Sequence, residues 1–349
     1  MRHNPGSAPS ERAGAGLEAR DVTGVTVGLF DSGVGGLSVL RHMLDCERPP
    51  WTRIVYLADL AHFPYGPLPP AEVRRLALAG VRALAAEGAA LVAIACNTAA
   101  SSGIRTGAVD TPVPIVDIIG PGARQVGALA KAGQGSRAIV LGTEGTVRSR
   151  VWERALREEG HVRDVTGWPC PFLASLIEEG RNGYVARRAV LEAVKGLALS
   201  PPGQAGPHLV VLGCTHYPFA ADTFEKVLRE HVLHGPVRIV DPSGALAVEV
   251  ASRLRSMGPG KGRATGPGVR DPIDRAREGL EESSGERPSK ERPVVEVVFR
   301  TTGRTGHFRR RARQLLADRL AGDGFRLRLD EVKEITLAAA VNAIEGPFE

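Results

Sequence analysis

Two cysteines follow apolar runs of the same kind. Residues 91–95 lead into Cys96, residues 209–213 lead into Cys214, and small hydrogen-bonding residues follow both cysteines. Such runs are typical of buried parallel strands, and open α/β sheets bind ligands beyond the carboxyl ends of their strands. A single cysteine there is most often a small buried hydrophobe. Two in matching positions favour a cleft with two thiols, which can remove a proton from one face of a carbon and deliver one to the other face.

Each thiol then needs a neighbour that generates and orients the thiolate, because a free cysteine has a pKa of about 8.5. Asp31 is the candidate for one thiol and His216 for the other. Asn97, Thr98 and Thr215 add uncharged donors suited to a substrate carboxylate. The alternative roles are a helix cap for Asp31 and a surface or capping residue for His216.

A third apolar run, residues 25–30, ends in a glycine-rich turn. Asp31 and Ser32 precede Gly33, Gly35 and Gly36. The turn has neither the GxGxxG spacing of dinucleotide sites nor the Gly-Lys-Ser/Thr of a phosphate-binding loop. We therefore interpret it as a carboxylate or small-anion site, because glycines let a backbone approach a ligand and the following helix N-terminus favours an anion.

The other two cysteines have no such context. Cys46 lies outside the strand pattern, and Cys170 lies in a Trp-Pro-Cys-Pro segment into which no strand is predicted to lead, so we expect it to be a packing residue. The four cysteines form no CxxC pair and no zinc-ligand spacing with histidines. The chain also lacks HExxH and GxSxG motifs, which favours a reaction without metal or cofactor.

The elements that must position these residues alternate along the chain. Continuous apolar runs and amphipathic stretches such as 71–86 predict an α/β fold with parallel sheets. Residues 1–23 are expected to be a flexible tail, and residues 256–293 a solvated, disordered insertion. Further predicted strands are 54–58, 115–118, 137–141, 238–240, 294–300 and 325–329, and a basic helix is predicted at 309–320.

Composition argues against a nucleic-acid-binding, a secreted or a membrane-spanning protein. The net charge is +6, but only 6 of the 45 basic residues are Lys, and the Arg residues are spread over the chain, unlike the clustered charge of a nucleic-acid binder. No secretory signal and no apolar run of about 18–20 residues is present. We expect a cytoplasmic protein with reduced thiols.

Ordered motifs then resemble those of bacterial glutamate racemase, a family among the cofactor-independent aspartate/glutamate racemases. The resemblance covers about residues 25–255 and resumes at 299–303. The matching segments are residues 30–40, Tyr56-Leu-Ala-Asp59 with Pro64-Tyr65-Gly66, Ala95-Cys-Asn-Thr-Ala99, residues 141–146, Cys170-Pro-Phe with residues 176–180, and Leu212-Gly-Cys-Thr-His-Tyr-Pro218.

The resemblance implies a role for each catalytic candidate. Cys96 would face D-glutamate with Asp31 as its assistant, and Cys214 would face L-glutamate with His216 and Glu178 as its assistants. Glu178 matches the first Glu of the family's Glu-Glu-Gly stretch, which makes its neighbour Glu179 the weaker candidate. The residues implied to hold the substrate are Asp31, Ser32, Tyr65, Gly66, Asn97, Thr98, Thr215 and His216.

The family likeness also implies two similar α/β domains around a shared cleft. Residues 24–118 and 235–345 would form the first domain, completed by the C-terminal return of the chain, and residues 119–234 would form the second. No cofactor and no metal would be needed. Glutamate would be the partner, without membrane or nucleic acid, and a homodimer is compatible with the resemblance. The product D-glutamate would feed peptidoglycan synthesis and so cell-wall biogenesis and cell shape.

Some features depart from the family or support other functions. The triplet at residues 61–63 is unusual, and we assign His62 no role beyond that of a surface residue. An aspartate or other amino-acid racemase of the same superfamily is the alternative enzyme, and two cysteines argue against a single-thiol decarboxylase or isomerase. A nucleic-acid-binding regulator would use the basic residues 308–313, which we interpret instead as a solvated helix face.

Overall fold

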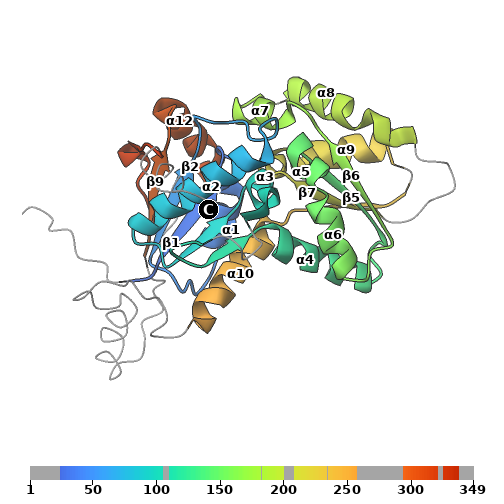
Figure 1. Cartoon of the computed structure of the whole chain (residues 1–349). Helices are drawn as coiled ribbons and strands as arrows, with labels where there is room; N and C mark the ends of the chain where they lie inside the picture. The colour runs from blue at the N-terminus through green and yellow to red at the C-terminus, as the bar shows by residue number, and fades with distance from the viewer. Residues whose placement is uncertain are drawn as a thin grey trace, which may run out of the picture.

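The computed structural model describes residues 24–104, 110–181, 183–199, 208–233, 235–257, 294–320 and 325–337. The predicted tail at 1–23 and residues 258–293 of the predicted insertion lie outside the described residues. The described chain forms two parallel sheets, each with helices packed against it (Figure 1). We call the part built on the larger sheet the first lobe and the part built on the smaller sheet the second lobe.

The first lobe contains a seven-stranded sheet of order β10-β9-β2-β1-β3-β4, in which β11 also pairs with β9. Every pairing is parallel. Its strands are β1 (Thr26–Asp31), β2 (Arg53–Ala58), β3 (Leu91–Ile94), β4 (Ile115–Asp117), β9 (Val295–Thr301), β10 (Phe325–Leu327) and β11 (Lys333–Glu334). Because β9 pairs with β2, the C-terminal part of the chain returns to the first lobe, as the sequence predicts (Figure 1).

The second lobe contains a four-stranded parallel sheet of order β6-β5-β7-β8. Its strands are β5 (Arg137–Gly142), β6 (Asp164–Pro169), β7 (His208–Gly213) and β8 (Val237–Val240). Strand β8 pairs with β7, although the predicted domain boundary at residue 235 would assign it to the first domain. The chain therefore leaves the second sheet only after Val240. The division into domains otherwise stays a prediction.

Helices connect the parallel strands of both sheets. The longer ones are α1 (Leu37–Leu44), α2 (Pro70–Ala86), α4 (Ile119–Lys131), α6 (Val151–Glu158), α8 (Gly183–Val194), α9 (Ala221–His231), α10 (Ser243–Ser256) and α12 (Thr305–Leu315). Three short ones follow strand ends: α3 (Asn97–Ala99), α5 (Glu144–Ser149) and α7 (Leu173–Glu178). The predicted basic helix at 309–320 begins earlier and ends earlier, as α12, and a short 3₁₀ turn at Ala317–Arg319 follows.

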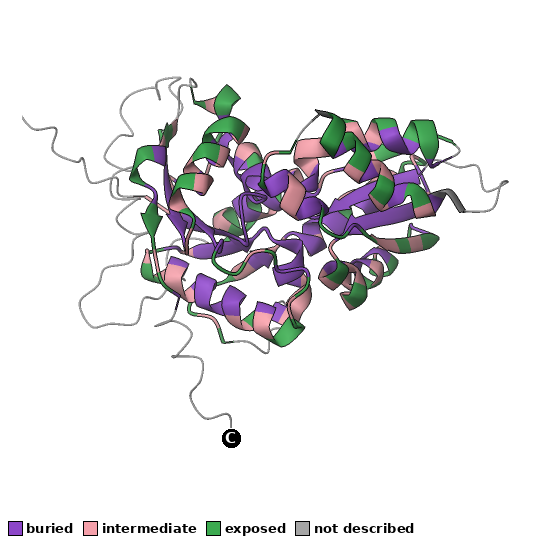
Figure 2. Cartoon of the chain, turned by 90° about the horizontal axis from the view of Figure 1, so that it is seen from above, coloured by how far each residue is buried: buried purple, intermediate pink, exposed green. Residues whose placement is uncertain are grey.

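Two apolar cores hold these layers together (Figure 2). The first core fills the first lobe and continues onto one face of the second sheet through Val140 and Val211. The second core covers the opposite face through Leu141 and Leu212. Successive side chains of a strand point to opposite faces, so a sheet buried on both faces needs the continuous apolar runs seen in the sequence.

Strand β6 is one of two described strands, with the two-residue β11, that the sequence prediction missed. Its residues are exposed or half-buried and include Gly167 and Pro169, so they form no apolar run. It is nonetheless paired with β5 along its whole length and leads directly into Cys170. The expectation that no strand precedes Cys170 is therefore wrong, because an edge strand needs no buried pattern. Cys170 itself packs in the second core, as expected of a packing residue.

Candidate active site

The two cysteines predicted from the sequence lie in one cavity between the lobes. Cys96 follows β3 of the first sheet, and Cys214 follows β7 of the second. Both side chains line the cavity and both are at least 95% buried. The cavity has a volume of about 20 Å³, while a water molecule needs about 10–15 Å³. The remaining lining residues are Ser32, Phe63, Pro64, Tyr65, Gly66, Asn97, Thr98, Thr143, Ala174, Thr215 and His216.

The Cys96 side of the cavity is built from strand ends of the first lobe. The Cys96 Sγ lies 3.5 Å from the Ser32 Oγ, which follows the neighbouring strand β1. Burial raises the pKa of the Cys96 thiol to about 12, and the nearby Asp31 carboxylate adds to that rise. Without a proton acceptor, this side of the cavity therefore holds a neutral thiol, which is a proton donor.

Asp31, which is not among the residues that line the cavity, links the two lobes. Its Oδ1 accepts a hydrogen bond from the Gly33 amide, and its Oδ2 accepts one from the Thr215 hydroxyl, both at 3.0 Å. Burial raises the pKa of this carboxyl to about 6, against the lowering effect of the nearby His216. Its charge acts on Cys96 through space rather than through a direct hydrogen bond. A carboxyl with that pKa can exchange protons near neutral pH.

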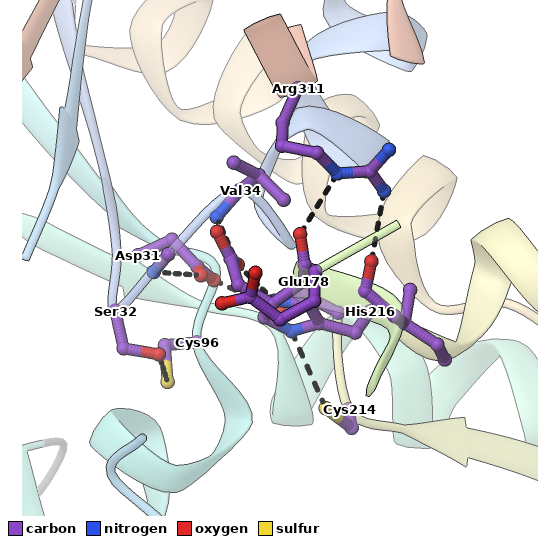
Figure 3. A network of polar contacts seen from close by, with 12 residues as sticks. Asp31, Ser32, Val34, Cys96, Glu178, Cys214, His216 and Arg311 are labelled. Atoms are coloured by element: carbon purple, nitrogen blue, oxygen red, sulfur yellow. Dashed lines mark hydrogen bonds and ion pairs between the residues drawn. The ribbon is translucent and has the colours of Figure 1, made fainter. Parts of the chain in front are cut away.

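The Cys214 side contains a histidine and a glutamate in series (Figure 3). The His216 Nδ1 lies 3.8 Å from the Cys214 Sγ, and the His216 Nε2 lies 2.7 Å from the Glu178 Oε2. Burial lowers the pKa of His216, but hydrogen bonding to Cys214 and Glu178 outweighs it and raises the pKa to about 10. An imidazolium beside the thiol stabilises the thiolate, which is the form that removes protons.

Glu178, at the end of α7, is fully buried and accepts hydrogen bonds from both lobes. The Val34 amide and His216 bind its Oε2, and the His307 Nε2 binds its Oε1 at 3.0 Å. Burial alone raises the pKa of this carboxyl, but the two histidines together lower it to about 2. Glu178 is thus held as a carboxylate. Its neighbour Glu179 is half-exposed and pairs with Arg304 instead.

The polar groups of the remaining predicted substrate residues differ in whether they already have a hydrogen-bond partner. The Asn97 Oδ1 accepts a hydrogen bond from the Trp152 indole, while its amide nitrogen has no partner among the described residues. The Thr98 hydroxyl lies 2.8 Å from that of Thr143. The Tyr65 hydroxyl donates to Asp59 and is not free for a ligand. The Asn97 amide is therefore the clearest unengaged donor for a carboxylate.

The glycine-rich turn after β1 does hold an anion, but the anion is the protein's own Glu178 carboxylate. A Cβ on Gly33 would lie 2.5 Å from the Glu178 Oε2, and a Cβ on Gly35 would lie 2.3 Å from the Thr215 Oγ1. The glycines therefore permit close contact with the second lobe. The expected approach of this backbone to a free ligand stays a prediction.

Sequence reasoning missed two polar residues at the site. Thr143 lies in a segment noted for its resemblance, and its position as the N-cap of α5 gives a local signal that could have identified it. His307 has no such signal, because it precedes a run of arginines whose pattern is typical of a solvated helix face. Only the approach of α12 to α7 brings His307 to Glu178.

The basic segment of α12 is not a free charged face. The Arg311 Nε and Nη2 donate to the carbonyl oxygens of Glu178 and Ile177, both at 2.8 Å, and Arg313 pairs with Asp330. The expectation of a solvated face is thus wrong for Arg311, whereas Arg313 is 52% exposed. His62, expected at the surface, is 41% exposed and binds the buried Asp59.

The chain is similar to known proteins both in sequence and in fold. Residues 39–250 match the family described as Asp/Glu/Hydantoin racemase. A glutamate racemase of Parafrankia is 37% identical over 60% of this chain and 73% of that protein, and one of Enterococcus faecalis is 34% identical over 65% of this chain and 78% of that protein. The crystal structure of glutamate racemase isoform RacE1 from Bacillus anthracis superposes with a TM-score of 0.64 at 26% identity, covering 87% of this chain and 97% of that one.

Within the described segments, no helix combines the length and the apolar character that crossing a membrane requires.

Proposed function

Because the chain belongs to the Asp/Glu/Hydantoin racemase family and is an amino-acid racemase, we propose that it interconverts L- and D-glutamate through the thiols of Cys96 and Cys214. The observation that carries the proposal is the pairing of these thiols in one cavity, one from each lobe. The close relatives compared above bear the name glutamate racemase, which supports glutamate as the substrate.

The proposed reaction consists of two proton transfers. From L-glutamate, the Cys214 thiolate takes the α-proton, and the electron pair of the broken C–H bond stays on the α-carbon. The Cys96 thiol then gives its proton to the opposite face, which yields D-glutamate, a Cys214 thiol and a Cys96 thiolate. The reverse reaction uses the same groups with their protonation states exchanged. This assignment of faces follows the resemblance of the motifs.

The neighbours of each thiol support these roles. The raised pKa of His216 keeps a positive charge beside the Cys214 thiolate, and the Glu178 carboxylate orients that imidazole. On the other side, the pKa of Asp31 near 6 leaves a carboxylate at neutral pH, and its charge helps to keep Cys96 as the thiol that donates a proton. The two thiols thus receive different assistance, a cation on one side and an anion on the other.

Substrate binding requires the cavity to widen. About 20 Å³ accommodates about one water molecule, which is far less than an amino acid with two carboxylates. The bonds from Val34 to Glu178 and from Thr215 to Asp31 join the lobes beside the cavity. We expect glutamate to separate the lobes and its carboxylates to bind the Asn97 amide and the threonine hydroxyls. D-glutamate formed in this way would supply peptidoglycan synthesis.

The test is exchange of the α-proton in deuterated water, followed by NMR for L- and D-glutamate separately. Replacement of either thiol by Ser should reduce racemisation at least about 10²-fold, as expected for loss of an acid–base group. Cys96→Ser should still incorporate deuterium into L-glutamate, and Cys214→Ser into D-glutamate, each without inversion. Cys46→Ser, outside the cavity, is the matched control.

Two outcomes would contradict the proposal. Racemisation that survives either substitution undiminished excludes the two-thiol mechanism, and a requirement for added pyridoxal phosphate excludes a cofactor-free one. A kcat/KM higher for aspartate than for glutamate would keep the mechanism and assign the protein to the alternative substrate.

A further inference from the structure

Two histidines bind the two oxygens of the Glu178 carboxylate. His216, from the second lobe, lies 2.7 Å from the Oε2, and His307, from α12 of the first lobe, lies 3.0 Å from the Oε1. The His307 side chain is only 11% exposed. Whereas His216 contacts a proposed catalytic thiol, His307 contacts no cavity-lining residue among the described contacts and reaches the site only through Glu178.

The position of His307 is fixed by its neighbour on the helix. Phe308 is fully buried, and its ring lies 5.7 Å from the rings of both Tyr56 and Phe299. These rings belong to the core of the first lobe. The His307 donor is therefore presented from a rigid helix, which is what a positioning group requires.

The backbone of Glu178 is held separately from its carboxylate. Arg311, one helical turn after His307, donates to the carbonyl oxygens of Ile177 and Glu178 at the end of α7. The last carbonyls of a helix lack partners within it, and here the guanidinium supplies donors to both, in addition to the Gly180 amide that binds the Ile177 carbonyl oxygen. Loss of the His307 side chain would therefore release the carboxylate without releasing α7.

A carboxylate held on one oxygen can still turn, because the terminal torsion of a glutamate side chain is broad and roughly two-fold. Among the described residues, only His307 forms a hydrogen bond with the Oε1, while the Val34 amide and His216 share the Oε2. Without His307 the buried Oε1 lacks a donor, and the carboxylate can exchange its oxygens between partners.

We propose that His307 is a positioning residue for the Cys214 half of the reaction, because it fixes the carboxylate that orients His216. The inference rests on the two-thiol function proposed above. Neither His307 nor Glu178 has a direct contact with Cys96. Loss of His307 should therefore slow proton exchange at Cys214 and leave exchange at Cys96 unchanged.

The equilibrium constant of racemisation fixes the ratio of the kcat/KM values for L- and D-glutamate, so these values do not report on one thiol alone. The experiment therefore measures proton exchange at Cys214 and at Cys96 separately. In the Cys96→Ser background, His307→Asn should slow deuterium incorporation into L-glutamate about 10-fold, the cost of one lost hydrogen bond to a charged group. In the Cys214→Ser background, His307→Asn should leave incorporation into D-glutamate within about twofold. His307→Gln, longer by one methylene and able to donate to Glu178, should restore most of the L-side rate.

Controls separate the possible failures. His231→Asn removes a half-exposed histidine that pairs with Glu230 and should change neither rate. Thermal unfolding of each variant reports whether it folds, and the Asn and Gln variants of His307 should melt alike. Equal slowing on both sides, or no slowing on the L side, would overturn the role of His307. Absence of one-sided exchange in the two parent Ser variants would instead overturn the two-thiol function itself.

Discussion

Gly35→Ala is a perturbation whose size follows from the structure. The added Cβ would lie 2.3 Å from the Thr215 Oγ1 and 2.6 Å from the His216 Nδ1, whereas ordinary contacts begin at 3.4 Å. The turn of the first lobe and the strand end of the second must therefore separate by about 1 Å to restore normal contact. Gly35 does not have a positive φ, so its backbone suits alanine and the effect is one of space alone.

The separation displaces both residues that follow Cys214. A misplacement of about 1 Å at a reacting site costs about 10²-fold in rate, so we expect kcat/KM for racemisation to fall by about that factor. Overpacking a tight contact costs about 1–3 kcal/mol of stability, or relaxes by opening the lobes. Racemisation measured by circular dichroism of glutamate, together with the Tm, distinguishes loss of activity from loss of folding.

Gly306→Ala is the matched control for that substitution. Gly306 is an exposed residue of α12, and the nearest atom to its added Cβ is the flexible end of Arg310 at 3.7 Å. Because alanine restricts the unfolded chain and favours a helix, the protein should be stabilised by about 0.4–1 kcal/mol with unchanged activity. Gly35→Ala with kcat/KM within threefold of the parent protein would refute the contact between turn and second lobe as a determinant of activity.

Three further predictions concern the site and the core. Glu178→Gln should lower kcat about 10²-fold, because the charge that orients His216 is lost, while Glu179→Gln, which breaks a half-exposed pair, should change kcat less than about twofold; the reverse order in steady-state assays would move the role by one residue. The pKa of Asp31 near 6 means that its carboxylate, which accepts hydrogen bonds from Gly33 and Thr215 at the site, is present above that pH and is lost as the pH falls through it. The pH profile of kcat/KM should therefore have an acidic limb near 6, and a flat profile between pH 5 and 7 would contradict a role of the Asp31 carboxylate in the reaction. Gly80→Ala puts a Cβ 2.3 Å from the Phe30 ring and should destabilise the protein by about 1–3 kcal/mol in urea unfolding despite the better helix propensity of alanine; an unchanged midpoint would show that the ring can move.

Strands that are buried on both faces carry continuous apolar runs, and the sequence therefore predicts them directly. Strands β3 and β7 are continuous apolar runs because both faces of each sheet are covered. Strand β6, at the edge of its sheet, leaves most of its residues partly in solvent and therefore carries no such pattern. The strand at 238–240 is predicted correctly, but the sheet to which it belongs is not. The reason is that apolar residues do not specify which strand is the pairing partner.

The local sequence by itself determined which residues stand at strand ends. Cys96, Asp31 and Cys214 each follow an apolar run, and the carboxyl ends of parallel strands lie on one edge of a sheet. Their convergence on ligand-binding edges could thus be predicted, together with the polar residues beside them. The roles that we assign to them remain predictions for the exchange experiments.

Only the tertiary structure decided how the two edges meet. The turn after β1 binds the carboxylate of Glu178, and α12 adds His307 to that same carboxylate across a separation of 129 residues. Nothing local marks these contacts, because a hydrogen bond between lobes depends on the relative placement of two sheets and not on the propensity of either segment. The physical reason is burial: a carboxylate removed from water must be fully paired, and its partners can come from any part of the chain that the fold brings within reach.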